Sequence, residues 1–453
     1  MWTTMVLFLV LGAAALAIDA AHARYVKVQL DAAVDSAALA AASGLPAGQS
    51  EARRRAKAYA ARNIVAGQPV LLSDGDIDIG VWDSLTRTFT SGGAHGTAMA
   101  IRVRANRQVN YGFGRILGIP EGQVVSTGTG VFRSRDIVLV LDYSASMNDD
   151  SELTHVQRLG LYAIRKNLQE IWMDLGSPQY GRMTFDPVLI TSTSTSTILS
   201  QLGLTNVPYP YPSGNWTTYV NYVKNDSVLQ QTGFAKRYGY LTLINYWLAE
   251  MPMADETPDL WKTHEQPLTA VKDAVTVFLN YLRQVHTLDQ AALVAYTSAA
   301  GGASIEVPLT RDTNLVENRS RHMQAGHYHH YTNIASGIES GRDELQAHGR
   351  GASLKMLVLL SDGNANWLNG MNNPAAARRA TLTQARLAAD DAFPIVTISL
   401  GSDSDVSLMQ EVADITSGVH YHVKTDDSLE DTQAQLIEVF SAIAGHRALR
   451  LVE

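Results

Sequence analysis

The sequence contains no cysteine in 453 residues. This absence excludes a disulfide framework, thiol catalysis and every cysteine-based zinc site. It is compatible with a protein of the bacterial cell envelope. Charged residues make up only 18% of the chain, and acidic residues outnumber basic ones, which gives a formal net charge of −8. Nucleic-acid binding normally requires a basic face, so this charge balance argues against a nucleic-acid partner.

The usual signatures of catalysis are missing as well. The sequence has no phosphate-binding P-loop, no HExxH zinc motif and no GxSxG nucleophile elbow. Gly112-Phe113-Gly114-Arg115 is too isolated to be a nucleotide-binding loop. Hydrolysis by a metal-activated water lacks a clear general base. We therefore expect a binding protein and not an enzyme.

No Lys or Arg precedes the apolar run at the amino terminus, which extends from Thr4 to Ile18 and is broken by Asp19. This run is short for a bilayer span, which takes about 20 residues. Two interpretations stay open: an uncleaved membrane anchor, or a secretory signal cleaved at Ala21-His22-Ala23. Arg24 and Lys27 follow the run, which disagrees with a cytoplasmic amino terminus.

Three short segments, far apart in the chain, match the pieces of one divalent-cation site: Asp142-Tyr143-Ser144-Ala145-Ser146, Tyr331-Thr332-Asn333 and Ser361-Asp362-Gly363. The first and third follow continuous apolar runs, Ile137 to Leu141 and Leu354 to Leu360, of the kind that forms buried parallel strands. Ligands of open α/β sheets bind beyond the carboxyl ends of such strands. Carboxylates and hydroxyls at that edge make an oxygen-lined site suited to Mg²⁺, Mn²⁺ or Ca²⁺. Taken singly, each segment is better explained by ordinary turn and cap chemistry, and only the three together favour the cation site.

Strands and helices are expected to alternate in the carboxy-terminal half. Ala291 to Tyr296 and Pro394 to Leu400 indicate two further buried strands. Apolar residues at three- and four-residue spacing predict helices around and between the strands, over residues 268–285, 332–348, 374–392, 406–416 and 428–444. This alternation implies βαβ crossovers. The expected fold is therefore α/β, with a doubly wound parallel sheet.

With these elements the sequence resembles a von Willebrand factor A domain, which carries a metal-ion-dependent adhesion site (MIDAS). The resemblance implies that Ser144, Ser146 and Thr332 supply hydroxyl ligands, directly or through water. Asp142 and Asp362 would be the acidic members, with Mg²⁺ as the expected ion and Mn²⁺ or Ca²⁺ as alternatives. Few direct carboxylates leave such an ion electrophilic. An acidic group of a protein partner can then complete its coordination shell.

The Ala-rich segment from Tyr25 to Ala42, which follows the apolar run, is similar to the amino-terminal segment of TadE/TadG-like pilus-assembly proteins. Combined with an A domain, the resemblance is to the TadG type. It implies a protein anchored in the bacterial inner membrane, with its bulk periplasmic or surface-exposed. Its partners would be pilus or envelope components, in pilus assembly or surface adhesion. The alternative function is an A-domain cofactor of an ATP-driven remodelling machine, against which the apolar amino terminus argues.

We divide the chain into four parts on this basis. Residues 1–44 are a membrane anchor and Ala-rich helix, and residues 45–134 are a small pilin-like α+β region. Residues 135–149 and 266–453 form the A-like domain, into which residues 150–265 are inserted beside the metal site. Within the insertion, the Ser/Thr tract from Thr191 to Thr197 is expected to be a solvated loop or an edge strand.

Two clusters are candidates for contact with a partner. Tyr209, Tyr211 and Trp216 lie in a proline-rich stretch of the aromatic insertion, where they form either a recognition surface or the insertion's own core. His327 and His330 lie in a histidine-rich segment directly before Thr332. Their spacing matches no closed zinc site. Two interpretations therefore stay open: they contact a ligand held at the metal, or they belong to a hydrophilic loop.

Overall fold

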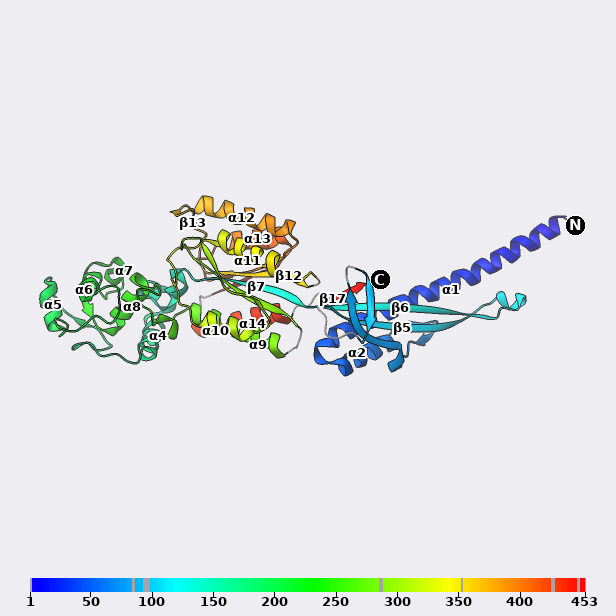
Figure 1. Cartoon of the computed structure of the whole chain (residues 1–453), viewed down its shortest axis with the longest axis horizontal. Coiled ribbons are helices and arrows are strands. Elements are labelled where there is room, and N and C mark those ends of the chain that lie inside the picture. Colours follow the sequence, from blue (N-terminus) through cyan, green and yellow to red (C-terminus); the bar gives the residue numbers. More distant parts are fainter. Residues whose placement is uncertain are drawn as a thin grey trace.

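The computed structural model describes residues 2–83, 86–92, 98–284, 288–351, 353–424, 428–445 and 449–452. Figure 1 shows three parts along the long axis of the molecule. The amino-terminal region forms a long helix and a sheet, an α/β domain occupies the middle, and the insertion lies at the end far from the N terminus. The functional site lies in the α/β domain, so this part is described first.

The α/β domain is built on a six-stranded sheet. Its strands are β7 (Arg135–Asp142), β10 (Gln290–Tyr296), β11 (Ala303–Thr310), β12 (Leu354–Ser361), β15 (Ile395–Leu400) and β16 (His420–Val423). Their order in space is β11-β10-β7-β12-β15-β16. Every pairing is parallel except that of β11 with β10, so an antiparallel strand closes one edge of a parallel sheet. The predicted doubly wound α/β fold is confirmed.

Helices cover both faces of this sheet (Figure 1). They are α9 (Leu268–Gln284), α10 (Thr313–Arg321), α11 (Ile334–His348), α12 (Pro374–Asp390), α13 (Val406–Thr416) and α14 (Leu429–Gly445). Side chains alternate across a strand, and those of β7 show how this alternation builds two cores. Ile137, Leu139 and Leu141 pack in the core with α9 and α14, whereas Val138 and Val140 pack in the core with α11, α12 and α13.

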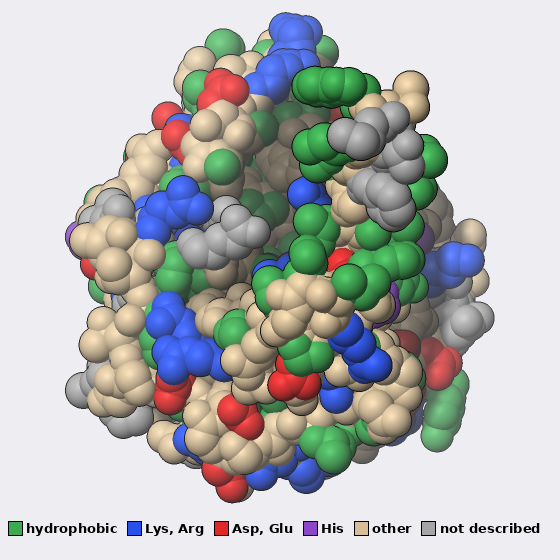
Figure 2. Space-filling model, turned by 90° about the vertical axis from the view of Figure 1, so that its right-hand side faces the viewer, with side chains coloured by type: hydrophobic (Ala, Val, Ile, Leu, Met, Phe, Trp, Pro, Cys, Tyr) green, Lys and Arg blue, Asp and Glu red, His purple; other side chains and the backbone are tan. Residues whose placement is uncertain are grey.

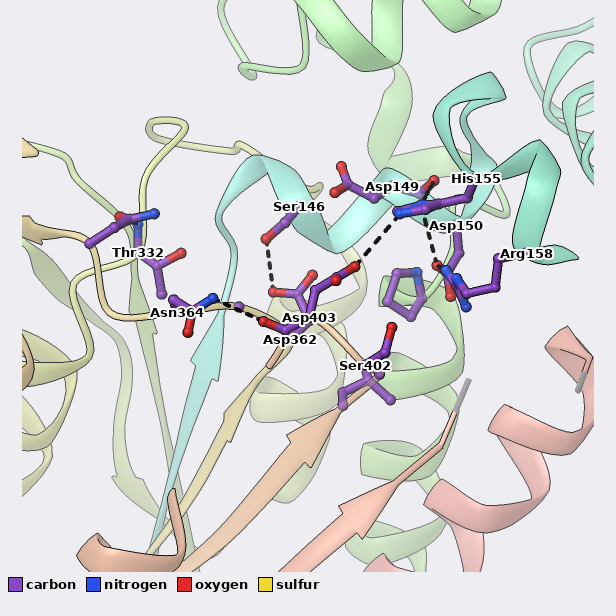
Figure 3. A pocket seen from close by; sticks show the side chains of 15 residues that line it. Ser146, Asp149, Asp150, His155, Arg158, Thr332, Asp362, Asn364, Ser402 and Asp403 are labelled. Atoms are coloured by element: carbon purple, nitrogen blue, oxygen red, sulfur yellow. Dashed lines mark hydrogen bonds and ion pairs between the residues drawn. The ribbon is translucent and has the colours of Figure 1, made fainter. Parts of the chain in front are cut away.

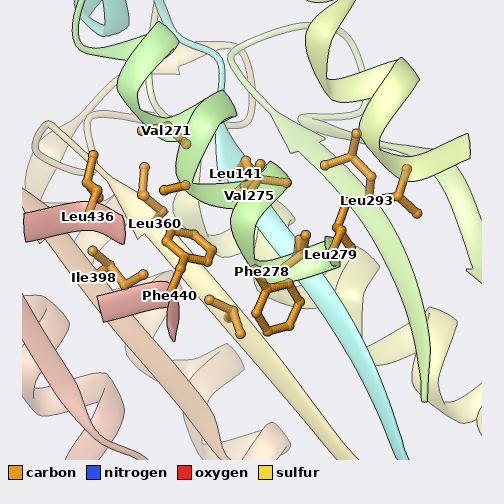
Figure 4. Close-up of a cluster of buried hydrophobic side chains, with 14 of the residues drawn as sticks. Leu141, Val271, Val275, Phe278, Leu279, Leu293, Leu360, Ile398, Leu436 and Phe440 are labelled. Atoms are coloured by element: carbon orange, nitrogen blue, oxygen red, sulfur yellow. The ribbon is translucent and has the colours of Figure 1, made fainter. Parts of the chain in front are cut away.

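The core beneath α9 and α14 is shown in Figure 4, where the rings of Phe278 and Phe440 lie 6.0 Å apart. Phe278 is fully buried, so Phe278→Ala leaves a cavity and is expected to lower the free energy of unfolding by about 3–5 kcal/mol. Urea titration of the full chain measures this loss. Leu315→Ala, at an exposed position on α10, is the control and is expected to change it by less than about 0.5 kcal/mol. Equal losses in the two variants would contradict the described packing.

The amino-terminal part begins with α1 (Trp2–Gly44), one continuous helix of 43 residues. Among the described residues it is the one helix long and apolar enough to cross a membrane, judged by length and composition. Its apolar first half is exposed. Its second half contributes buried side chains to the core, such as those of Val26, Leu30 and Val34. The helix therefore has one half suited to lipid and one half packed on protein.

The second half of α1 packs on an antiparallel sheet with the strand order β17-β6-β5-β3-β4. The strands are β3 (Ile77–Asp83), β4 (Thr88–Ser91), β5 (Ala98–Asn110), β6 (Glu121–Arg133) and β17 (Leu449–Val452). α2 (Gln49–Ala61) and the short strands β1 (Ile64–Val65) and β2 (Gln68–Pro69) complete this part. Figure 1 shows β5 and β6 as a long hairpin that extends toward the end carrying the N terminus.

The chain connects this sheet to the α/β domain twice. β6 ends at Arg133 and β7 begins at Arg135, so a single residue, Ser134, separates the two sheets. After α14, the chain returns to the first sheet, where β17 pairs with β6. The sequence-based division placed all of 266–453 in the A-like domain, and the structure differs because this last strand completes the other sheet.

The insertion is helical and has its own core. It contains α3 (Val156–Leu159), α4 (Leu161–Asp174), α5 (Thr195–Gln201), α6 (Trp216–Asn225), α7 (Ser227–Gln231) and α8 (Tyr240–Glu250), with the short pair β8 (Val188–Leu189) and β9 (Arg237–Tyr238). The expectation of a loop or edge strand at Thr191 to Thr197 is wrong for its second half. Ser194 caps α5 there, because its hydroxyl accepts a hydrogen bond from the Thr197 N–H at 3.3 Å.

Candidate metal centre

The candidate site lies at the carboxyl ends of the two central strands of the α/β sheet. β7 ends at Asp142 and β12 ends at Ser361. The two strands are paired in parallel, with Leu141 opposite Leu360, so their carboxyl ends lie side by side. The loop before α11 supplies Thr332 to the same place. All five predicted ligand residues therefore meet at one edge of the sheet.

Asp142 is fully buried and both of its carboxylate oxygens accept hydrogen bonds. Its Oδ1 accepts from the Ser144 N–H at 2.9 Å, and its Oδ2 accepts from the Ser361 hydroxyl at 2.8 Å. These two bonds hold the carboxylate in one orientation at the end of the strand. Ser361 is therefore a positioning residue, a role that its place beside Asp362 in the sequence did not reveal.

The hydroxyl groups form a continuous chain to the second carboxylate. Thr332 Oγ1 donates to Ser144 Oγ at 3.1 Å, and Ser144 Oγ lies 3.1 Å from Ser146 Oγ. Ser146 Oγ donates to Asp362 Oδ1 at 2.8 Å. Three hydroxyls and the Asp362 carboxylate are thus linked by hydrogen bonds, and Asp142 adjoins them through its bond to the Ser144 N–H. This is a donor set of hard oxygens, as Mg²⁺ and related cations prefer.

Both carboxyl groups are held in an environment that opposes their charge. Burial raises the pKa of Asp142, and the hydrogen bonds from Ser144 and Ser361 offset this only in part. Burial, followed by the nearby Asp142 carboxylate, raises the pKa of Asp362 well above its usual range. Within the part of the chain that the structure describes, no Lys, Arg or His forms an ion pair with either group. A bound cation would relieve this electrostatic cost.

Thr332 and Gly363 shape the space in front of the hydroxyls. The Thr332 N–H donates to Asn366 Oδ1 at 2.9 Å, which fixes the loop that carries its hydroxyl. A Cβ at Gly363 would lie 3.6 Å from Ser146 Oγ and 3.7 Å from Thr332 Oγ1. The absence of a side chain at Gly363 therefore leaves the two hydroxyls accessible. No group of three His, Asp or Glu side chains in the described ranges is arranged to hold an ion, so a cation at this site would need the hydroxyls as ligands.

A pocket of about 220 Å³ opens from this site (Figure 3). Its far side is lined by charged residues that the sequence analysis missed, namely Asp149, Asp150, His155, Arg158 and Asp403. Arg158 pairs with Asp150, and His155 Nε2 lies 3.7 Å from Asp403. Asp149 and Asp150 lie shortly after the DxSxS segment, and Asp403 lies shortly after β15. Their positions just beyond strand ends were the signal in the sequence that could have identified them. Aspartates predominate among the charged residues that line the pocket.

The two histidines predicted to contact a ligand lie outside this pocket. His327 packs against Tyr328, and burial lowers its pKa to about 4, so it is neutral at physiological pH. The backbone carbonyl of His330 accepts a hydrogen bond from the Ala145 N–H at 3.0 Å, and burial lowers the pKa of its side chain. His330 thus supports the DxSxS loop through its backbone, and neither ring is placed to touch a ligand in the pocket.

The aromatic residues proposed as a recognition surface pack in the core of the insertion or against it. Trp216 is buried, and its indole N–H donates to the Val207 carbonyl at 2.8 Å. The Tyr209 hydroxyl accepts from Trp247 at 2.9 Å, and the ring of Tyr211 packs edge-on against the same Trp247. Trp216 thus lies in the core of the insertion, as the alternative expected, whereas Tyr209 and Tyr211 are only partly buried and pack against that core.

Comparisons with known protein families agree with this architecture. The von Willebrand factor type A domain model matches residues 261–435, the putative Tad-like Flp pilus-assembly model matches residues 26–129, and the putative Flp pilus-assembly TadE/G-like model matches residues 1–44. The chain has a TadG-like architecture. The A-domain match begins at residue 261 because the insertion separates β7 from α9 in the sequence, although the two elements pack in one core.

Several solved structures match parts of the chain. The von Willebrand factor type A protein from Catenulispora acidiphila is 16% identical and covers 39% of the chain, with a TM-score of 0.30. The pilus adhesin SpaC from Lactobacillus rhamnosus GG is 13% identical and covers 83%, with a TM-score of 0.35. The chain spans 37% and 36% of these two proteins. Proximal thread matrix protein 1 from the mussel byssus is 12% identical, covers 70% of the chain and 96% of its own length, and has a TM-score of 0.30. No curated protein gives a match.

Proposed function

We propose that this protein is a membrane-tethered, non-enzymatic envelope protein that binds an acidic group of a protein partner through a divalent cation, in pilus assembly or surface adhesion. The observation that carries the proposal is the convergence of Asp142, Ser144, Ser146, Thr332 and Asp362 at one sheet edge. The TadE/G-like match at residues 1–44 and the apolar half of α1 support the tether. The same apolar helix disfavours a role as a cofactor of an intracellular remodelling machine.

The residues present fit a cation such as Mg²⁺. Ser144, Ser146 and Thr332 offer neutral oxygens, and Asp142 and Asp362 offer the negative charge. When bound, the ion supplies a positive, Lewis-acidic centre for a carboxylate of the partner. The chain's own residues orient this centre: Ser361 holds Asp142, Asn366 holds Thr332, and Gly363 keeps the approach open.

The test is retention of envelope proteins by the immobilised full chain in Mg²⁺, in Mn²⁺, in Ca²⁺ and in chelator. The unmutated protein is expected to retain a partner only when metal is present, and Thr332→Ala is expected to lose that retention. Thr381→Ala is a matched control, because Thr381 is also a buried threonine with a bonded hydroxyl, but on α12. Equal retention in every lane, or in Thr332→Ala and the unmutated protein, would contradict the proposed site.

A further inference from the structure

Asp19 interrupts the apolar half of α1, and the structure shows what holds its carboxylate. Its oxygens accept hydrogen bonds from three consecutive backbone N–H groups, those of Gly112 at 2.9 Å, Phe113 at 2.9 Å and Gly114 at 2.7 Å. Successive backbone N–H groups of this kind form a concave anion site. They belong to the turn that joins β5 to β6, residues 111–120, which we call the hairpin tip. Asp19 therefore fastens the hairpin tip to the helix.

The hairpin tip is folded tightly enough to require glycine. A Cβ at Gly114 would lie 2.6 Å from the Ile119 carbonyl oxygen and 3.1 Å from the Tyr111 Cβ, so no other residue fits there without a shift of the backbone. The Ile119 N–H donates to the Gly114 carbonyl at 2.9 Å and closes the turn. Gly112-Phe113-Gly114-Arg115, which matched no nucleotide-binding loop, thus binds the carboxylate of Asp19 within the same molecule.

The outer side of the hairpin tip is apolar and exposed. Ile116 is 81% exposed, Leu117 is 62% exposed and Ile119 is 56% exposed, and Phe113 lies beside them. Figure 1 shows the tip at the end of the molecule that carries the N terminus. Figure 2 views the molecule from that end, where hydrophobic side chains gather on the parts nearest the viewer. An exposed apolar cluster of this kind marks a contact surface.

We propose that the hairpin tip inserts Phe113, Ile116, Leu117 and Ile119 into the surface of the lipid bilayer beside α1. This inference rests on the proposed membrane tether. The residues from Trp2 to Ile18 extend roughly 25 Å at about 1.5 Å per residue, which is close to the ~30 Å hydrocarbon thickness of a bilayer. Asp19 and the attached tip therefore lie where the helix leaves the hydrocarbon. Apolar side chains at that depth are the ones that interfacial segments bury.

Charge at the same level favours a lipid surface over a protein partner. Arg115 is exposed on the hairpin tip, and Arg24 is exposed on α1 five residues beyond Asp19. Basic residues at this height are placed to meet the phosphates of anionic lipids. A second attachment beside the helix also restricts how the body of the protein tilts on the membrane. The α/β domain is joined to this sheet through Ser134 and again where the chain returns to β17, so it is thereby held in a restricted orientation.

The absence of cysteine allows a direct test with single labels. Full-length Ile116→Cys, carrying a polarity-sensitive fluorophore, is reconstituted into vesicles of phosphatidylethanolamine and phosphatidylglycerol. Its emission is expected to shift to the blue and to be quenched by lipids that carry nitroxide groups on their acyl chains. Leu71→Cys is the matched control, because Leu71 is 79% exposed and lies outside the tip. Its label is expected to stay in water and to escape quenching.

The outcomes separate this inference from the tether on which it rests. Failure of the full chain to float with vesicles would overturn the tether itself. Flotation with an Ile116 label that remains in water would overturn the lipid contact alone. A label shielded from water but not quenched by lipid would show a protein contact, which also overturns it. Asp19→Ala is expected to weaken quenching at Ile116 without loss of flotation, and unchanged quenching would contradict the role of Asp19 as the clamp.

Discussion

Asp142→Asn is expected to abolish the stabilisation of the protein by Mg²⁺ while leaving the metal-free protein at least as stable as the unmutated one. The amide keeps the shape of the carboxylate and can still accept the Ser144 N–H, while its NH₂ can donate to the Ser361 hydroxyl. It removes one of two buried carboxyl groups whose ionised forms repel each other and pair with no cationic side chain in the described ranges. The substitution therefore removes electrostatic repulsion from the metal-free site and removes affinity for the cation at the same time.

Thermal unfolding with and without Mg²⁺ measures both effects. At a free ion concentration about a hundred times Kd, binding to the folded state stabilises it by about 2.7 kcal/mol, which corresponds to a rise in Tm of roughly 5–10 °C for a domain of this size. Asp289→Asn is the control, because Asp289 is a buried carboxylate that pairs with Arg135 at the opposite end of β7. That variant is expected to lower Tm but to keep the Mg²⁺ shift. An equal Mg²⁺ shift in Asp142→Asn would show that Asp142 is not part of the cation site.

The α/β fold and the members of the candidate site could be predicted because each is tied to a local pattern. Asp142 directly follows one apolar run typical of a buried strand, Asp362 lies one residue beyond another, and parallel strands present their carboxyl ends at one edge. Thr332 precedes a helix with clear amphipathic spacing. The geometry between them could not be predicted, because Ser361 and Asn366 act through contacts that span more than 30 residues of chain.

The features that escaped prediction depend on contacts between distant segments. β17 is a four-residue strand whose partner β6 lies more than 300 residues earlier, and no local pattern indicates that pairing. Asp19 looks like a defect in an apolar run until its partners, some 93 to 95 residues later, are known. The aromatic side chains at Tyr209 and Trp216 are as suitable for a surface as for a core. The hydrogen bond from Trp247 to Tyr209 and the burial of Trp216 show how they pack.

A buried ion pair at the start of α9 is expected to lower the stability of the folded protein. Lys272 Nζ lies 4.0 Å from Glu265 Oε1, and both side chains are almost completely buried. The Ala325 N–H donates to Glu265 Oε1 at 2.9 Å, but Lys272 Nζ and Glu265 Oε2 have no hydrogen-bond partner among the described residues. A buried pair with unsatisfied atoms does not recover the free energy of removing two charges from water. The pair is therefore expected to destabilise the fold relative to a neutral pair of similar shape.

The double variant Glu265→Gln with Lys272→Met is accordingly expected to raise the free energy of unfolding near pH 7.5 by about 1–4 kcal/mol, whereas Lys272→Met alone is expected to lower it.

Burial raises the pKa of Glu265 from 4.5 to about 7, so the unfolded chain releases this proton first and stability falls as pH rises from 4.5 to 7. Burial lowers the pKa of Lys272 from 10.5 to about 8, so the folded protein releases that proton first and stability rises from pH 8 to 10.5. Urea titrations across this range are expected to show a minimum between pH 7 and 8 in the unmutated protein. Both limbs should flatten in the double variant, because neither side chain titrates there. A double variant less stable than the unmutated protein near pH 7.5 would mean that the pair stabilises the joint between the insertion and α9.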